Sequence, residues 1–269
     1  MSSEPRLGRR LVVLAVAVGV VGLHWVWVAA RLRAFEGAHD LVVVHYSLPA
    51  IGLIAIGGVL TWLGRVAWLL LRVERAVSRL VAVPWPTTLT VAARGADVDA
   101  VVCVDDPVPG AFCAGAVWPR VIVTTGLVER LEVEEIVAVL LHEREHLWRR
   151  DHLWRAAWRA ASELLWHVPL VEWWSRRRLE LSELAADRAV QARLGPGPLA
   201  RALTVATAHT GLDAAGFDGA AALRAAQILG DRLPDRRPTG RALLVSTGAL
   251  GLTVNLAMCL VETAVHLAS

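Results

Sequence analysis

Three long apolar segments constrain the fold of this chain more than any other feature of its sequence. Residues 11–30, 41–63 and 242–261 are each close to the length of about 20 apolar residues that a helix needs to cross a bilayer. The mean hydropathy of +0.49 and the twelve tryptophans are likewise typical of membrane proteins. We therefore predict three transmembrane helices. A cleaved signal peptide is the alternative for the first segment, but this segment is long for one and arginines follow it.

The arginines predict how these helices are oriented. All 28 basic residues are arginines, and they cluster before the first segment, after the second and before the third. Because basic clusters beside membrane helices stay on the cytoplasmic side, the N-terminus and the block after the second segment should be cytoplasmic. We therefore expect a multi-pass protein of the cell membrane. Its predicted domains are residues 1–71 with two transmembrane helices, 72–241 as a cytoplasmic domain, and 242–269 with the third helix and a short tail.

Charge and cysteine content indicate which binding partners and which cellular compartment to expect. The net charge is only +3 and the arginines lie beside apolar segments, so we expect contact with membrane lipid and none with nucleic acid. Cys103, Cys113 and Cys259 show no metal or disulfide spacing. Their odd number fits a reducing compartment.

The cytoplasmic block is predicted to combine a small sheet with several helices. Short β-branched segments bounded by Gly, Pro or Asp indicate a sheet of hairpins with strands at 87–93, 100–104, 111–117 and 121–125. Apolar residues at helical spacing then predict helices at about 132–150, 152–166, 171–194, 198–209 and 219–229. The expected fold class is a mainly α integral membrane protein with a cytoplasmic α+β domain.

The stretch "HEREH" at residues 142–146 carries the most specific chemistry. On a helix, His142 and His146 share a face and can present two imidazoles to one Zn²⁺ ion. Glu143 is rotated away from the ion and can act as a general base on its water. The alternative is a solvated helix face that spells this pattern by chance. The apolar run before the motif favours a buried site, because buried polar groups without a ligand are costly.

A later helix offers the third ligand. In "RLELSELAADRAVQ" at residues 178–191, Glu183 and Asp187 are four apart, and small alanines between them allow close helix packing. We assign Glu183 to the metal and Asp187 to a hydrogen bond that orients a ligating imidazole. Glu180 is the competing ligand. The alternative for the whole segment is a salt-bridged surface helix.

These motifs together resemble a known family. "HEREHLWRRDHL", "LLWHVPLVEWW" and "ELAADRAV" look like the membrane zinc peptidases of the antibiotic-sensor type, typified by the BlaR/MecR signal transducers. The upstream "AFCAGAVWPRVIVTTGLVERLEVEEIVAVL" and the later "ALRAAQILGD" are also similar to that family. The resemblance covers roughly residues 85–240, and the paired metal motifs are its specific part.

The resemblance implies a zincin-like domain with one zinc ion. HtpX-like and prenyl-protein peptidases share the motifs more distantly, but they usually have glycine where Glu145 stands here. The full sensors carry a penicillin-binding domain after the last span, and we expect none in this chain, which ends at Ser269. The implied roles are zinc ligands His142, His146 and Glu183, general base Glu143, and ligand support Asp187.

Weaker candidates surround these motifs. His167 either donates a hydrogen bond to the developing oxyanion or caps the helix end before Pro169. Asp151 is expected to pair with a neighbouring arginine or to cap the next helix, and His152 is expected to be structural. The tryptophans between residues 148 and 174 predict either a helix in the lipid headgroup layer or an aromatic core.

The sequence therefore predicts an integral-membrane zinc endopeptidase that hydrolyses a peptide bond with metal-activated water. Its partner would be a protein or peptide substrate, in a regulatory cleavage of a cytoplasmic or membrane-adjacent protein. The small sheet could pair an extended substrate along its edge. The alternative is a transmembrane signalling or scaffold protein with a structural, non-catalytic metal site. Glu143 discriminates between them, because a structural site has no use for a base there.

Overall fold

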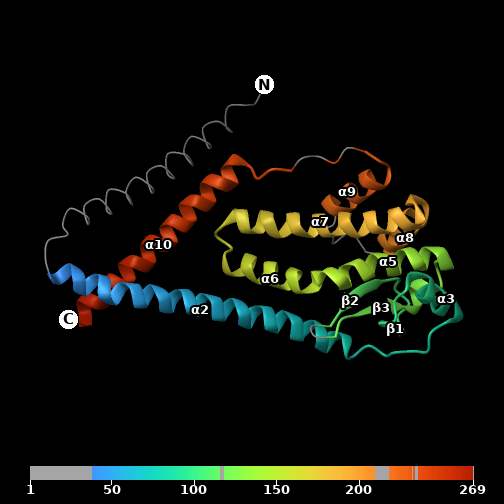
Figure 1. Cartoon of the computed structure of the whole chain (residues 1–269), viewed down its shortest axis with the longest axis horizontal. Helices are drawn as coiled ribbons and strands as arrows, with labels where there is room; N and C mark the ends of the chain where they lie inside the picture. The colour runs from blue at the N-terminus through green and yellow to red at the C-terminus, as the bar shows by residue number, and fades with distance from the viewer. Residues whose placement is uncertain (1–37, 116–117, 210–217, 232, 234–235, 269) are drawn as a thin grey trace, which may run out of the picture. The chain divides into compact units, whose positions relative to one another are not determined.

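The computed structural model describes residues 38–115, 118–209, 218–231, 233 and 236–268 (Figure 1). Most of them are helical, and three short strands form one small mixed sheet, which confirms a mainly α class with a small sheet. The first predicted span, residues 11–30, lies outside the described residues. The chain forms two compact units: Met1–Arg65, Ala160–Trp174 and Arg236–Ser269 in unit 1, and Val66–Arg159 and Ser175–Asp235 in unit 2.

Unit 1 contains long apolar helices. Helix α2 (Ala38–Val77) begins in this unit and continues into unit 2, and α10 (Gly240–Ala268) lies in unit 1. Gly52–Val77 of α2, with a mean hydropathy of 1.8, is the one helix found among the described residues to be long and apolar enough to cross a membrane. The predicted span 41–63 falls in α2, but the apolar stretch extends past its predicted end. The predicted span 242–261 falls in α10, and the three-span topology stays a prediction.

The sheet of unit 2 has β3 (Arg120–Thr124) at its centre. This strand pairs in parallel with β1 (Val101–Val104) and antiparallel with β2 (Ala111–Ala114). The expectation of hairpins throughout is therefore wrong for β1, which pairs with β3 and not with its neighbour in sequence. The reason is burial. Val121, Ile122 and Val123 are fully buried, so β3 needs cover on both faces and takes the central position.

The segment predicted as the first strand is a helix. Thr87–Ala96 forms α3, and the strand expected at 87–93 is wrong. The buried residues of this segment recur at helical spacing, since Leu89, Ala92, Ala93 and Ala96 lie on one face. Small alanines let that face pack closely on α5. The two helices approach so closely at Gly95 that a Cβ atom there would lie only 3.3 Å from the Val137 side chain. The helical spacing of the buried residues thus determines the structure of this segment more than its content of β-branched residues does.

Helix α5 (Val133–Arg149) is defined at both ends. Glu132 and Glu135 form a capping box at its start, where carboxylates also favour the positive end of the helix dipole. At its end Arg150 adopts a left-handed conformation with φ of 52°, which is uncommon for a residue other than glycine. This turn starts the next helix at Asp151, so that residue lies beside the last turn of α5.

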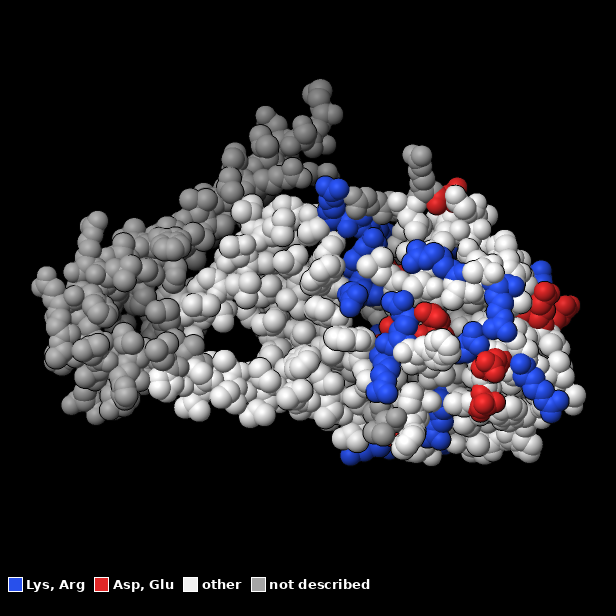
Figure 2. Space-filling view, viewed as in Figure 1, with Lys and Arg blue, Asp and Glu red and all other residues white. Residues whose placement is uncertain are grey.

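Four of the remaining helices lie close to their predicted bounds, and the short helix α4 (Thr125–Val128) was not predicted. The four are α6 (Asp151–Leu164), α7 (Pro169–Leu194), α8 (Pro196–His209) and α9 (Asp218–Ile228). The core of unit 2 lies between α3, α5, α8 and the sheet. In Figure 2 the charged side chains gather on one part of the described surface, and another part is almost entirely uncharged.

Candidate metal centre

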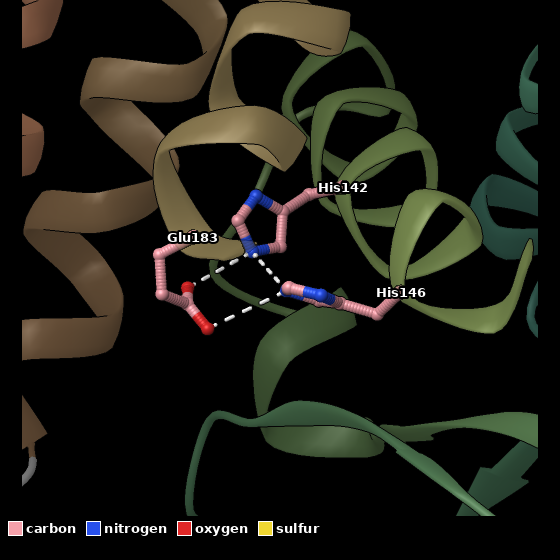
Figure 3. A group of neighbouring side chains, drawn as sticks. All are labelled: His142, His146 and Glu183. Carbon is pink, nitrogen blue, oxygen red and sulfur yellow. Dashed lines mark hydrogen bonds and ion pairs between the residues drawn. The ribbon is translucent and has the colours of Figure 1, made fainter. Parts of the chain in front are cut away.

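Helices α5 and α7 bring together three side chains of the kinds that bind metal ions (Figure 3). His142 and His146 lie on one face of α5, and Glu183 of α7 points toward them. The Nε2 atoms of the two imidazoles are 3.1 Å apart. The Glu183 carboxylate lies 3.3 Å from His142 Nε2 and 3.5 Å from His146 Nε2. Among the described residues, these three form the one group of His, Cys, Asp or Glu close enough to share an ion.

The spacing of these atoms fits a tetrahedral metal ion. With zinc–nitrogen and zinc–oxygen distances of about 2.0–2.1 Å, neighbouring ligands of a tetrahedral ion lie roughly 3.3 Å apart. The three observed separations of 3.1, 3.3 and 3.5 Å bracket this value. Two imidazole nitrogens and one carboxylate oxygen are also a ligand set that catalytic zinc sites use, with water in the fourth position. The residues present therefore fit one zinc ion.

The outer nitrogens of both imidazoles lie within 3 Å of carboxylates. His142 Nδ1 lies 2.9 Å from Asp187 Oδ1, and His146 Nδ1 lies 2.8 Å from Asp151 Oδ2. When each Nδ1–H donates to its carboxylate, each Nε2 carries a lone pair, and the two lone pairs face each other. Two acceptors at 3.1 Å cannot hydrogen-bond, so this arrangement calls for a cation between them.

Asp187 is held in place from a second side. It is fully buried, and Arg224 of α9 donates to both of its oxygens, at 2.7 and 2.8 Å. Burial by itself would raise the pKa of Asp187, but the hydrogen bonds from His142 and Arg224 lower it. Asp187 is therefore ionised and lies beside His142, and its role in orienting a metal ligand stays a prediction.

The charges of the cluster favour a bound cation. Burial would lower the pKa of His142, but hydrogen bonds to Asp187 and Glu183 outweigh it and raise that pKa to about 9. Conversely, burial would raise the pKa of Glu183, but the hydrogen bond and charge of His142 lower it. The site thus stabilises positive charge, either as a proton on His142 or as a metal ion that replaces this proton.

Glu143 lies outside the three-residue cluster and contacts the edge strand of the sheet. Cys113 Sγ of β2 lies 3.2 Å from Glu143 Oε2 and 3.0 Å from the Glu143 backbone oxygen. Burial and the neighbouring Glu143 charge raise the pKa of Cys113. The group is consequently a neutral thiol that donates to the carboxylate, and this contact fixes Glu143 against β2.

Arg155 of α6 is the more exposed cation at the cluster. Its Nη2 lies 2.5 Å from Glu183 Oε1, and 44% of its side chain is exposed, compared with 16% for Arg224. Its charge also acts on Cys113, where it opposes the rise in pKa. Arg155 therefore lies on the solvent side of the cluster, near the Cys113 thiol that contacts Glu143.

The structure separates the competing candidates. Glu180 pairs with Arg177 at 3.1 Å and does not belong to the cluster, whereas Glu183 does. His167 belongs to unit 1, where its Nε2 lies 3.1 Å from Thr253 Oγ1, and its catalytic role stays a prediction. Trp148 and Trp166 are 78% and 80% exposed, so they are not part of an aromatic core. The placement of the tryptophan-rich helix on a membrane also stays a prediction.

Four residues at the cluster were not predicted to lie there. Asp151 was expected to pair with an arginine, and it does approach Arg149 at 3.7 Å, but its short contact is with His146. The signal was its position two residues after the end of the motif helix. Cys113, Arg155 and Arg224 come from other elements, and no local spacing ties them to the motif.

Replacing Asp151 with asparagine should weaken metal binding. The imidazole of His146 would lose the carboxylate that orients it and increases its basicity, so we expect a loss of metal affinity of about 10–100-fold. Competition with a chromophoric chelator measures this change. Asp99→Asn, at an exposed aspartate, is the control and should bind as the unaltered protein does. Equal affinities in the two variants would exclude a role for Asp151 at the centre.

Comparison with known proteins identifies one matching family. The family model described as BlaR1 peptidase M56 matches residues 37–199, which is more than half of the 269 residues. This range contains α5 and the Glu183 and Asp187 turn of α7. No curated protein and no solved structure matches the chain.

Proposed function

Because the chain belongs to the BlaR1 peptidase M56 family, a metallopeptidase family, we propose that it is an integral-membrane zinc endopeptidase. It hydrolyses internal peptide bonds of a protein, and the expected role is regulatory cleavage of a cytoplasmic or membrane-adjacent partner. The main support for the proposal is that His142, His146 and Glu183 lie close enough together to share one ion. Glu143 directly follows His142 in the sequence.

The side chains around the cluster supply the parts of a hydrolytic site. A zinc ion, when bound by the two histidines and Glu183, supplies a Lewis acid that lowers the pKa of water toward ~7 and polarises a carbonyl group. Glu143 accepts the proton of the attacking water and transfers it to the leaving amine. Its hydrogen bond from Cys113 holds the carboxylate in one orientation for both transfers. Arg155, exposed at the cluster, donates to the carbonyl oxygen as negative charge develops there.

The edge of β2 supports binding of an extended peptide. Among the described residues β2 pairs with β3 alone, so its other edge is open to a further strand. Cys113 of β2 contacts Glu143, which places this edge beside the proposed base. A substrate that adds to this edge would align its backbone by main-chain hydrogen bonds and bring a peptide bond to the centre.

The proposed membrane location rests on α2. Gly52–Val77 is apolar and long, and large side chains such as Leu53 and Leu60 are more than 60% exposed. Apolar surface of this kind is stable in lipid and costly in water. α10 also exposes large apolar side chains, including Leu252 and Leu256, which supports a multi-pass arrangement.

Metal removal tests the proposed activity. The full chain, purified in detergent or in lipid nanodiscs, should cleave a mixed library of unstructured peptides at internal bonds. A chelator should abolish cleavage, because the three metal-binding side chains alone supply no Lewis acid. Addition of one equivalent of Zn²⁺ after removal of the chelator should restore it. Cleavage that persists in the chelator, or products trimmed only from peptide ends, would contradict a zinc endopeptidase.

A further inference from the structure

A pocket lies between α6 and α7 beside the metal-ligand cluster. Its volume is about 280 Å³, enough for roughly nine waters or for one large side chain. Both helices contribute to it within unit 2. Its lining includes Arg149, Asp151, Trp154, Arg155, Trp158 and Arg178.

The pocket has an excess of positive charge. Among the described residues, three arginines line it, and Asp151 is its one acidic lining residue. That carboxylate is already hydrogen-bonded to His146 at 2.8 Å. Arg178 is exposed and has no ion pair among the described residues, and Arg149 reaches its nearest carboxylates only at 3.7 and 3.8 Å. Guanidinium groups in this state are available to an anion, and carboxylates are their best-matched partners.

The pocket is connected to the metal-ligand cluster by two of its own lining residues. Asp151 contacts His146, and Arg155 contacts Glu183. One residue of an extended peptide spans about 3.3 Å. A substrate whose cleaved bond lies at the cluster therefore reaches the pocket with a side chain one or two residues away.

The walls of the pocket suit a side chain with an apolar stem. Trp154 and Leu179, which are 56% and 39% exposed, offer apolar surface next to the arginines. The methylene groups of a glutamate or aspartate can lie against such surface while the carboxylate meets the guanidinium groups. A lysine side chain would have the right length but the wrong charge.

We propose that this pocket is a specificity site that selects an acidic residue within two positions of the cleaved bond. The proposal rests on the proposed peptidase function, because it names the substrate class of the same site. Arg178 is the main determinant, with Arg149 beside it and Arg155 at the junction with the metal centre. Binding of a carboxylate in this pocket does not require cleavage of the peptide bond. It can therefore be measured in a form of the protein that does not cleave.

Matched peptides test the proposal. A cleavable sequence is first found in the peptide library, and each position within two residues of the cleaved bond is then set to Glu, Gln or Lys. Unaltered protein should cleave the best Glu peptide with a kcat/KM at least about tenfold above that of its Lys counterpart. Arg178→Glu should reverse this order, because the introduced carboxylate repels the substrate glutamate. Arg94→Glu, which reverses an exposed arginine of α3, is the control and should keep the preference.

A binding measurement separates this proposal from the peptidase function. Fluorescent Glu and Lys peptides are titrated into the zinc-loaded Glu143→Gln form, with and without Arg178→Glu. A Glu preference that depends on Arg178 would support the pocket even if no cleavage were ever observed. Cleavage without any acidic preference, unchanged by Arg178→Glu, would overturn the proposal and leave the peptidase function intact. If Arg178→Glu weakened binding to phosphatidylglycerol lipid but left the peptide preference unchanged, the pocket would instead bind lipid phosphate. That result would also overturn the proposal.

Discussion

Glu143→Gln is expected to abolish peptide cleavage while the metal stays bound. Glutamine has nearly the same size as glutamate, but it cannot accept the proton of the attacking water. Removal of a general base costs about 10²–10⁴-fold in rate. Glu143 is not one of the three clustered metal-binding residues, so metal content should not change. Cleavage rate and bound zinc are measured on the same purified sample.

Glu145→Gln is the matched control for this substitution. Glu145 lies on the same helix two residues later, and its carboxylate pairs with Arg149 at 3.8 Å. Its replacement removes the same charge from another face of the same helix and should leave the cleavage rate within a fewfold of the original. Equal losses in the two variants would mean that charge near the centre, and not a base at position 143, determines the rate. Full activity of Glu143→Gln would contradict the assigned role outright.

His142→Ala should remove the metal and the stabilisation that it provides. This residue supplies Nε2 to the cluster and Nδ1 to buried Asp187, so no neighbouring side chain can replace it. With free zinc at about 100 times the dissociation constant, a bound ion stabilises a protein by about 2.7 kcal/mol, which for a domain of this size raises Tm by roughly 5–10 °C. The variant should show no such increase when zinc is added.

His167→Ala provides the comparison for the loss of a histidine. His167 belongs to unit 1 and contacts Thr253, so its replacement should leave both bound zinc and the zinc-dependent rise in Tm unchanged. Circular dichroism of both variants checks that the helices remain. If His142→Ala bound zinc as tightly as His167→Ala does, His142 would not be a ligand.

The parts of the site that could be predicted from sequence are those set by local geometry. His142 and His146 share a face because any helix places residues four apart together, and the acidic start of α5 predicted that helix. Glu183 and Asp187 were found by the same spacing. The same spacing favoured Glu183 over Glu180, which stayed the competing ligand until the structure placed Glu183 in the cluster and paired Glu180 with Arg177.

The parts that sequence could not predict depend on contacts between distant segments. Cys113 approaches Glu143 because β2 lies at the edge of the sheet, and that position follows from β3 taking the centre. Arg224 reaches Asp187 from a helix 37 residues later in the chain. Such pairings leave no periodic signal in the sequence. The error at Thr87–Ala96 has a different cause, since composition was weighed above the helical spacing of its buried residues.

The most direct test of the account is X-ray absorption at the zinc edge on the purified, zinc-loaded chain. We expect one zinc per chain with two imidazole nitrogens at about 2.0–2.1 Å and a carboxylate oxygen at a similar distance, and no bound zinc in His142→Ala. Sulfur neighbours at about 2.3 Å, or an ion surrounded by water oxygens alone, would contradict it.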